Sequence, residues 1–186
     1  QFKSAVAKLS LEDKVKVVTG EDFWTTWALP AIELRKMVVS DGPSGVRGEL
    51  WDERSPSLSL PSATAMASTW DRVVMHRVGE VMAFEARRKN VDVVLGPTIN
   101  LHRSPLGGRH FEAYSEDSVL SGALAASFIK GIQGQGVGGC LKHFVANDAE
   151  TDRHTVNNVV DEATLREVYA LPFEIAVRDA HPWTCL

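Results

Sequence analysis

Charged side chains that could hold a polar ligand follow directly after three apolar stretches of this chain. The densest group lies in residues 96–117, GPTINLHRSPLGGRHFEAYSED, immediately behind the apolar run VDVVL of residues 91–95. Asp41 follows a second apolar stretch, and Lys142 and His143 end a third. Loops behind buried parallel strands collect functional groups because the strands hold them rigidly. The pattern predicts a binding site, or a site that acts directly on a substrate with Lys142 as a base.

A second acidic group could be imagined as a metal site. Asp148, Glu150, Asp152 and His154 alternate along the chain, and in an extended segment alternate residues share one face. Arg153 lies among them, and the His spacing of a metal site is missing. We therefore expect an ion-pair network here and no bound metal.

The composition indicates an ordinary globular domain with small or neutral partners. The chain has 186 residues, 44% hydrophobic and 24% charged, which is enough for one buried core. The net charge is −4 and the charges are interspersed, so there is no basic stripe for nucleic acid and no polybasic arm for a membrane. No apolar segment approaches membrane-spanning length, and the first residues lack a secretion signal. These features predict a cytoplasmic protein without nucleic-acid or membrane partners.

The two ends and the two cysteines carry further expectations. The chain begins at Gln1 rather than Met and ends inside an apolar run at Leu186, so we expect it to be part of a longer protein. Cys140 and Cys185 are flanked by apolar, strand-like residues. We expect two buried thiols rather than a disulfide.

Hydrophobic periodicity predicts strands that alternate with helices. Short apolar strands are expected at residues 37–39, 91–95 and 137–144, and a fourth begins in the last residues. Helices are expected after an N-cap at Ser10, from about Asp71 to Lys89 with Asn90 closing it in a left-handed conformation, from Val119 to Ile132, and after Asp161 with a kink or break at Pro172. Residues 21–35 and 48–62 are expected to be loops.

The order of these elements predicts an α/β fold. Polar clusters always follow a strand, which is typical of a parallel sheet with helical crossovers. An open doubly wound sheet and a closed barrel both satisfy the alternation. The glycines of residues 131–136 end a helix before a strand, whereas a dinucleotide-binding fingerprint opens a helix after one. The glycine pattern therefore predicts no nucleotide cofactor.

Three longer blocks carry a resemblance to a known family. They are SDGPSGVRG at residues 40–48, the loop of residues 96–117 and KHFVANDAETDR at residues 142–153. In this order they resemble glycoside hydrolase family 3, in its β-glucosidase branch, and the likeness extends over nearly the whole chain. It implies that residues 1–186 form the N-terminal half of a catalytic (β/α)8 TIM barrel, without its C-terminal half or later domains. It also implies that no cofactor is needed.

The resemblance implies which side chains bind the substrate. Asp41 matches an aspartate that accepts hydrogen bonds from hydroxyls of the non-reducing sugar, and Arg109 matches a sugar-binding arginine. Lys142 and His143 match a pair that reaches the same ring, and Arg153 is expected to orient neighbouring carboxylates. Such groups suit a neutral polyol because charged hydrogen bonds are strong and a guanidinium can fork across adjacent hydroxyls. The implied substrate-binding residues are Asp41, Arg47, Leu95, Arg109, Lys142, His143 and Arg153, with Arg47 and Leu95 on the pocket wall.

Structural roles compete with some of these assignments. Arg103 and Arg109 could be loop staples paired with Glu112, Glu116 or Asp117. We favour the structural role for Arg103 and ligand contact for Arg109. His102 and His110 are expected to be loop scaffolding. Trp51, in its polar loop, is the best candidate for an aromatic contact with a sugar.

The resemblance also indicates which groups lie elsewhere. Retaining hydrolysis needs two carboxyl groups about 5 Å apart, a nucleophile and an acid/base. The family's nucleophile is an Asp in a Ser-Asp-Trp-like motif, and no such motif follows His143. We therefore expect the nucleophile Asp and the acid/base Glu beyond Leu186. The block KHFVAND differs from the KHFPGHG type of the branch that removes N-acetylglucosamine, which disfavours that branch.

Three functions remain open on the sequence. The first is part of a β-glucosidase that hydrolyses terminal non-reducing β-D-glucosyl residues by double displacement, with a β-glucoside or oligosaccharide as substrate. The second is a half-barrel that binds sugars without cleaving them. The third is an unrelated barrel or open-sheet enzyme that uses Asp41, Lys142 and His143 directly. A half-barrel leaves apolar faces uncovered, so a homo-oligomer is also open.

Overall fold

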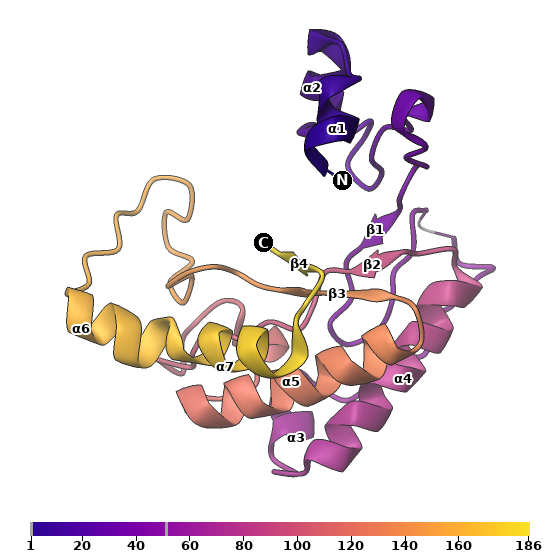
Figure 1. Cartoon of the computed structure of the whole chain (residues 1–186). Coiled ribbons are helices and arrows are strands. Elements are labelled where there is room, and N and C mark those ends of the chain that lie inside the picture. Colours follow the sequence, from indigo (N-terminus) through magenta and orange to yellow (C-terminus); the bar gives the residue numbers. More distant parts are fainter. Residues whose placement is uncertain (1, 51) are drawn as a thin grey trace.

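Four short parallel strands lie side by side in the order in which the chain makes them (Figure 1). The computed structural model describes residues 2–50 and 52–186. The strands are β1 Val39–Ser40, β2 Val93–Val94, β3 Gly138–Leu141 and β4 Thr184–Cys185. The register sets Val39 opposite Val93, Val93 opposite Gly138 and Cys140 opposite Thr184. In this sheet each strand pairs with the next strand along the chain. A barrel has this strand order, whereas a doubly wound sheet reverses its order at one point. The predicted fold class, an incomplete α/β barrel, is confirmed.

Helices cover one face of this sheet (Figure 1). α4 Arg72–Arg88, α5 Ser118–Gly134 and α7 Leu171–Ala180 pack side by side, with α5 in the middle and in contact with β3. α4 and α5 approach closely at Gly79 and Gly131, where an added Cβ would meet helix backbone. The main hydrophobic core fills the space between these helices and the strands; its largest fully buried side chains include Met75, Met82, Phe128, Ile129 and Ile132.

The helix starts follow the capping signals in the sequence. Ser10 caps α2 Leu11–Val17 by accepting a hydrogen bond from the backbone N–H of Asp13. Asp71 caps α4 and Asp117 caps α5 in the same way, each accepting backbone N–H groups of the first turn. Asn90 has the predicted left-handed conformation, with φ 55°. The predicted cap at Ser10 and the predicted left-handed conformation of Asn90 are therefore confirmed.

Other elements differ from the prediction. α1 Phe2–Ala7 and α3 Ala63–Ala67 were not expected, since neither short segment shows a helical period. The segment after Asp161 forms α6 Glu162–Thr164, then a π-helical turn η3 at Leu165–Tyr169, and α7 begins beside Pro172. The predicted break at Pro172 is therefore confirmed. Short 3₁₀ turns occur in the predicted loops, η1 at Pro30–Ile32 and η2 at His110–Glu112.

The third and fourth strands bring two corrections. β3 ends at Leu141, so residues 142–144 lie beyond the strand that we predicted to contain them. Both cysteines are free thiols, and Cys140 is buried as predicted, but Cys185 is exposed. β4 pairs only with β3 among the described residues, so one side of it is uncovered. No helix in the described part of the chain is long and apolar enough to span a bilayer.

Candidate functional site

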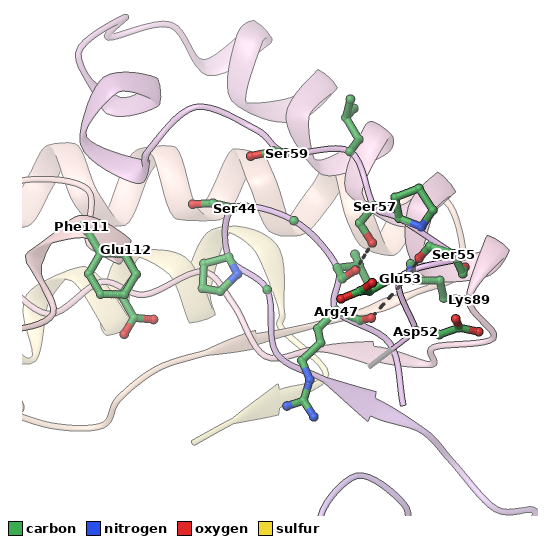
Figure 2. A pocket seen from close by; sticks show the side chains of 16 residues that line it. Ser44, Arg47, Asp52, Glu53, Ser55, Ser57, Ser59, Lys89, Phe111 and Glu112 are labelled. Carbon is green, nitrogen blue, oxygen red and sulfur yellow. Dashed lines mark hydrogen bonds between the residues drawn. The ribbon is translucent and has the colours of Figure 1, made fainter. Parts of the chain in front are cut away.

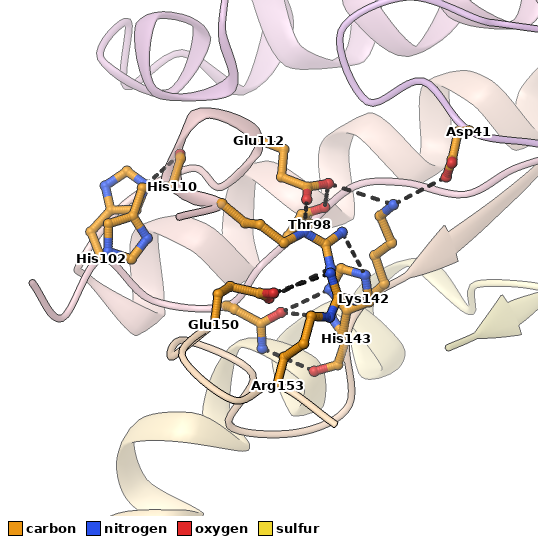
Figure 3. Close-up of polar contacts among 11 residues, drawn as sticks. Asp41, Thr98, His102, His110, Glu112, Lys142, His143, Glu150 and Arg153 are labelled. Carbon is orange, nitrogen blue, oxygen red and sulfur yellow. Dashed lines mark hydrogen bonds and ion pairs between the residues drawn. The ribbon is translucent and has the colours of Figure 1, made fainter. Parts of the chain in front are cut away.

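The ends of three strands bring distant residues together (Figure 3). Asp41 directly follows β1, Leu95 follows β2 and Lys142 follows β3. Backbone hydrogen bonds hold the segments in place: the Leu95 N–H donates to the Ser40 carbonyl at 2.8 Å, and the Ile99 N–H donates to the Lys142 carbonyl at 2.9 Å. The sheet therefore sets the spacing of the polar groups that follow it.

A buried ammonium group lies between two carboxylates. The Nζ atom of Lys142 is 3.6 Å from Oδ1 of Asp41 and 3.5 Å from Oε2 of Glu112. Lys142 is only 2% exposed and Glu112 only 5%, whereas Asp41 is partly open to solvent. An unpaired charge at this depth would be strongly destabilising, so the two carboxylates are what allow Lys142 to be buried.

The guanidinium of Arg109 is held through all three of its nitrogens. Nε pairs with Oε1 of Glu112, Nη1 lies 3.6 Å from Oε1 of Glu150, and Nη2 lies 3.1 Å from Nε2 of His143. Glu150 also pairs with Nη1 of Arg153 at 3.1 Å. Through Arg109 these contacts join the side chains into one connected network. Figure 3 shows its other members, Asp41, Glu112, Lys142, His143, Glu150 and Arg153.

The network sets the charge of its buried members. Burial acts to raise the pKa of Glu112, but the Lys142 charge and hydrogen bonds from Arg109 and Thr98 outweigh it and lower that pKa. Burial lowers the pKa of His143 to about 4, and the positive charges of Arg109 and Lys142 act in the same direction. At neutral pH Glu112 is therefore a carboxylate and His143 is uncharged.

Three residues in or beside this network, Glu112, Thr98 and Asn100, were not predicted from the sequence as site residues. Glu112 was considered only as a partner that could turn Arg109 into a loop staple. Its contact with Lys142 depends on how the loop before η2 folds. Thr98 donates its hydroxyl hydrogen to Oε2 of Glu112 at 2.9 Å, and Asn100 contacts His143. The alternation of Thr98 and Asn100 directly after a strand is the only sequence signal that could have identified them.

The remaining predicted site residues lie around the network. The guanidinium carbon of Arg47 is 4.4 Å from the centroid of the Trp24 ring, and its backbone N–H donates to the Asp41 carbonyl at 3.0 Å. Leu95 is half-buried at the end of β2. Trp51, proposed as an aromatic contact, lies outside the described residues.

Loop side chains that we interpreted as structural have identifiable partners. The ring nitrogen Nε2 of His102 is 3.1 Å from the His110 carbonyl and 3.0 Å from the Ala113 carbonyl, so it donates to both. This confirms the scaffolding role of His102. The predicted pairing of Arg103 with a loop carboxylate is not what the structure shows: its guanidinium carbon lies 5.9 Å from the centroid of the Tyr169 ring.

The acidic segment after His143, for which we predicted an ion-pair network, is not extended. Residues 151–155 form turns, and Asp152 has a left-handed φ of 53°, so the acidic side chains do not share one strand face. Glu150 forms the ion pairs described above, and Oδ1 of Asp148 accepts the Leu101 N–H at 2.8 Å. Across residues 2–50 and 52–186, no group of three or more His, Cys, Asp or Glu side chains is arranged to hold a metal ion.

A cavity of about 650 Å³ opens beside the loop that carries Asp41 (Figure 2). The cavity is lined by residues 42–47, by residues 52–53 and 55–59, and by Lys89, Phe111 and Glu112. Glu112 therefore connects this cavity with the ion-pair network.

The chain belongs to glycoside hydrolase family 3. Residues 10–182 match the family model described as the glycosyl hydrolase family 3 N terminal domain. The predicted family is thus confirmed.

The curated relatives of this chain include proteins named as β-glucosidases. "Probable beta-glucosidase I" of Emericella nidulans is 48% identical over 173 residues, which are 93% of this chain and 21% of that protein. "Thermostable beta-glucosidase B" of Acetivibrio thermocellus is 44% identical over an aligned length of 192 residues. The match covers 100% of this chain and 25% of that protein. The chain therefore spans about a fifth to a quarter of the length of these curated relatives.

Solved structures agree with this assignment. β-glucosidase 3B from Thermotoga neapolitana in complex with α-D-glucose superposes with a TM-score of 0.92 at 42% identity, over 98% of this chain and 28% of that chain. The β-glucosidase from Kluyveromyces marxianus in complex with glucose gives a TM-score of 0.95 at 40% identity, over 100% of this chain and 22% of that chain.

Proposed function

We propose that this chain forms the sugar-binding wall of a β-glucosidase that releases terminal non-reducing β-D-glucosyl residues with retention of configuration. Membership of the family and the names of its relatives support the reaction class. The observation that carries the proposal is the buried Lys142 ammonium, held between Asp41 and Glu112 at the ends of the strands. The proposed substrate is a β-glucoside or an oligosaccharide.

The charge balance of the network suits a neutral ligand. Three carboxylates, Asp41, Glu112 and Glu150, face three cationic groups, Lys142, Arg109 and Arg153. A neutral polyol brings no counter-charge, so a site built for it must neutralise its own charges before the ligand arrives. In the proposed complex Asp41 accepts hydrogen bonds from sugar hydroxyls, while Lys142 and Arg109 donate to hydroxyl oxygens.

The proposed chemistry needs two further carboxyl groups. A nucleophile attacks the anomeric carbon and an acid/base protonates the leaving oxygen and then activates water, with the two groups about 5 Å apart. We assign both to residues beyond Leu186, as the family resemblance implies. In this chain the wall residues orient the sugar, and Lys142 acts as a hydrogen-bond donor and not as a base.

Two assays of the chain itself test this proposal. We expect glucose to bind in calorimetric titration and aryl β-glucosides to remain uncleaved by residues 1–186 alone. Lys142→Ala should weaken glucose binding by roughly tenfold or more, since it removes a buried charged donor. The alternative is an unrelated enzyme that uses Lys142 directly as its base. It would be favoured if the chain alone cleaved the aryl β-glucosides and if Lys142→Ala abolished that cleavage.

A chimera separates a β-glucosidase from a module that only binds sugar. This chain would replace the equivalent segment of the Acetivibrio thermocellus β-glucosidase B, to which it is 44% identical. We expect the chimera to hydrolyse aryl β-glucosides and to lose that activity with Asp41→Asn. A folded chimera that binds glucose without hydrolysing it would favour the binding module.

We further propose a cytoplasmic location and no nucleic-acid or membrane partner. The interspersed charges and the net charge of −4 support the absence of nucleic-acid and membrane partners, because neither polyanion binding nor attachment to an anionic membrane is favoured. Sedimentation of the chain would show whether it forms a homo-oligomer.

A further inference from the structure

Asn100 clamps the backbone of His143. Its Oδ1 accepts the His143 backbone N–H at 2.8 Å, and its Nδ2 donates to the His143 carbonyl at 2.9 Å. The backbone N–H can only donate and the carbonyl can only accept, so these two bonds fix which end of the amide is oxygen. Asn100 is itself buried, with 6% exposure, and cannot turn freely.

The fixed amide determines where the imidazole of His143 carries its proton. Nδ1 of His143 lies 3.2 Å from the same Oδ1 of Asn100, an atom that only accepts. Nδ1 must therefore hold the hydrogen. On the other side of the ring, Nε2 lies 3.1 Å from Nη2 of Arg109, a group that only donates. Nε2 must therefore present its lone pair.

We propose that Asn100 is a positioning residue that holds His143 as the neutral Nδ1–H tautomer, so that Nε2 accepts a hydrogen bond from Arg109. The imidazole then anchors one of the two terminal nitrogens of the guanidinium, while Glu112 and Glu150 hold the other two nitrogens. Asn100 thus acts on the proposed sugar-binding arginine through His143. The expected effect of Asn100 on sugar binding rests on the proposed function, whereas the assignment of the His143 tautomer is independent of it.

The tautomer can be measured directly in the unmodified chain. Long-range ¹H–¹⁵N spectra of ¹⁵N-histidine-labelled protein distinguish protonated from unprotonated ring nitrogens, and the signals that vanish in His143→Gln identify this one of the six histidines. At neutral pH we expect a protonated Nδ1 and an unprotonated Nε2. A proton on Nε2, or on both nitrogens, would overturn the proposal.

Asn100→Asp tests whether Asn100 controls the ring. The substitution keeps the size of the side chain and places a carboxylate beside Nδ1, which favours the imidazolium. The titration midpoint of His143 should rise from its value of about 4 by roughly one to three pH units. Asn157→Asp, which adds the same charge at an exposed position, should leave it unchanged. An unchanged midpoint in the folded Asn100→Asp variant would contradict the positioning role.

Asn100→Leu removes both the acceptor and the donor. We expect the single-tautomer signal of His143 to be lost and glucose to bind roughly tenfold more weakly, with the circular dichroism spectrum unchanged. If the Asn100→Leu variant kept both the Nδ1–H signal of His143 and an unaltered affinity for glucose, the proposal would be contradicted. If this variant does not fold, the spectra of the unmodified chain and of Asn100→Asp still decide. An Nδ1–H tautomer in a chain that binds no sugar would remove the proposed function and leave the role of Asn100 intact.

Discussion

The charged residues of the site depend on one another because they are buried together. Glu112 neutralises both Lys142 and Arg109, so removing it leaves two cations with fewer partners. Sequence alone predicted that Asp41, Lys142 and His143 would lie close together, since Asp41 follows one predicted parallel strand and Lys142 and His143 lie near the end of another. It could not predict that Glu112 lies between them, because that position depends on the path of a loop whose geometry no local pattern specifies.

Glu112→Gln should therefore be strongly destabilising. Removing one partner of a buried ion pair leaves an uncompensated charge, and such losses are about 3 kcal/mol or more in free energy of unfolding. Urea denaturation of the two forms measures the difference, and calorimetry should also show weaker glucose binding. The matched control is Glu162→Gln, whose pair with Arg166 is 71% and 75% exposed, so a change below about 0.5 kcal/mol is expected. Equal effects of the two substitutions would contradict the role of Glu112.

The helices show which local sequence signals are sufficient to predict an element. α2, α4 and α5 were predictable because each has an Asp or Ser cap followed by a periodic apolar face. α3 and the π-helical turn η3 were not, since they are too short for a period and exist where the surrounding packing stabilises them. The close contact of α4 with α5 could not be predicted either, because Gly79 lies inside a predicted helix and Gly131 belongs to a glycine pattern that indicates only where a helix ends.

Gly79→Ala tests that contact between α4 and α5. An added Cβ would lie 2.3 Å from the Phe128 carbonyl oxygen and 2.8 Å from the Ile132 nitrogen, both backbone atoms that cannot move aside alone. The helices must separate, and the free energy of unfolding should fall by roughly 1–3 kcal/mol despite the better helix propensity of Ala. Thermal melts of the variant and the unmodified chain measure this loss. In the same melts the control Gly134→Ala in α5, where nothing lies within 4 Å of the added Cβ, should be neutral or stabilising. A stabilised Gly79→Ala variant would show that the two helices do not pack this closely.

Across the whole molecule, sequence could indicate the fold class but not which apolar faces are covered. The first helices illustrate this: Leu11 and Val18 are among the apolar residues that follow the predicted Ser10 cap, yet they are 79% and 81% exposed. Cys185 and Trp183, at the edge strand β4, are exposed as well. Periodicity identifies an apolar face, whereas its cover depends on what packs against it, and that information is not local.

The stability of the whole chain should depend on pH through His143. Its pKa is about 4 in the folded state against about 6.5 in an unfolded chain. Between these values the unfolded chain binds a proton that the folded chain does not, so the free energy of unfolding falls as the pH falls from about 6.5 to about 4, by on the order of 3 kcal/mol. Glu112, whose folded pKa is lowered, adds a further loss as the pH drops through that folded pKa.

His143→Gln isolates this contribution. Asp148 opposes the trend, because burial raises its pKa and the folded chain takes up that proton first, so the unmodified pH profile is a sum of terms. Gln does not titrate, and its effect on packing is the same at each pH. The stability difference between the unmodified chain and His143→Gln, from urea melts at about pH 7 and about pH 4.5, should therefore shrink toward acid. A difference that stays constant would mean that His143 is not held uncharged in the fold.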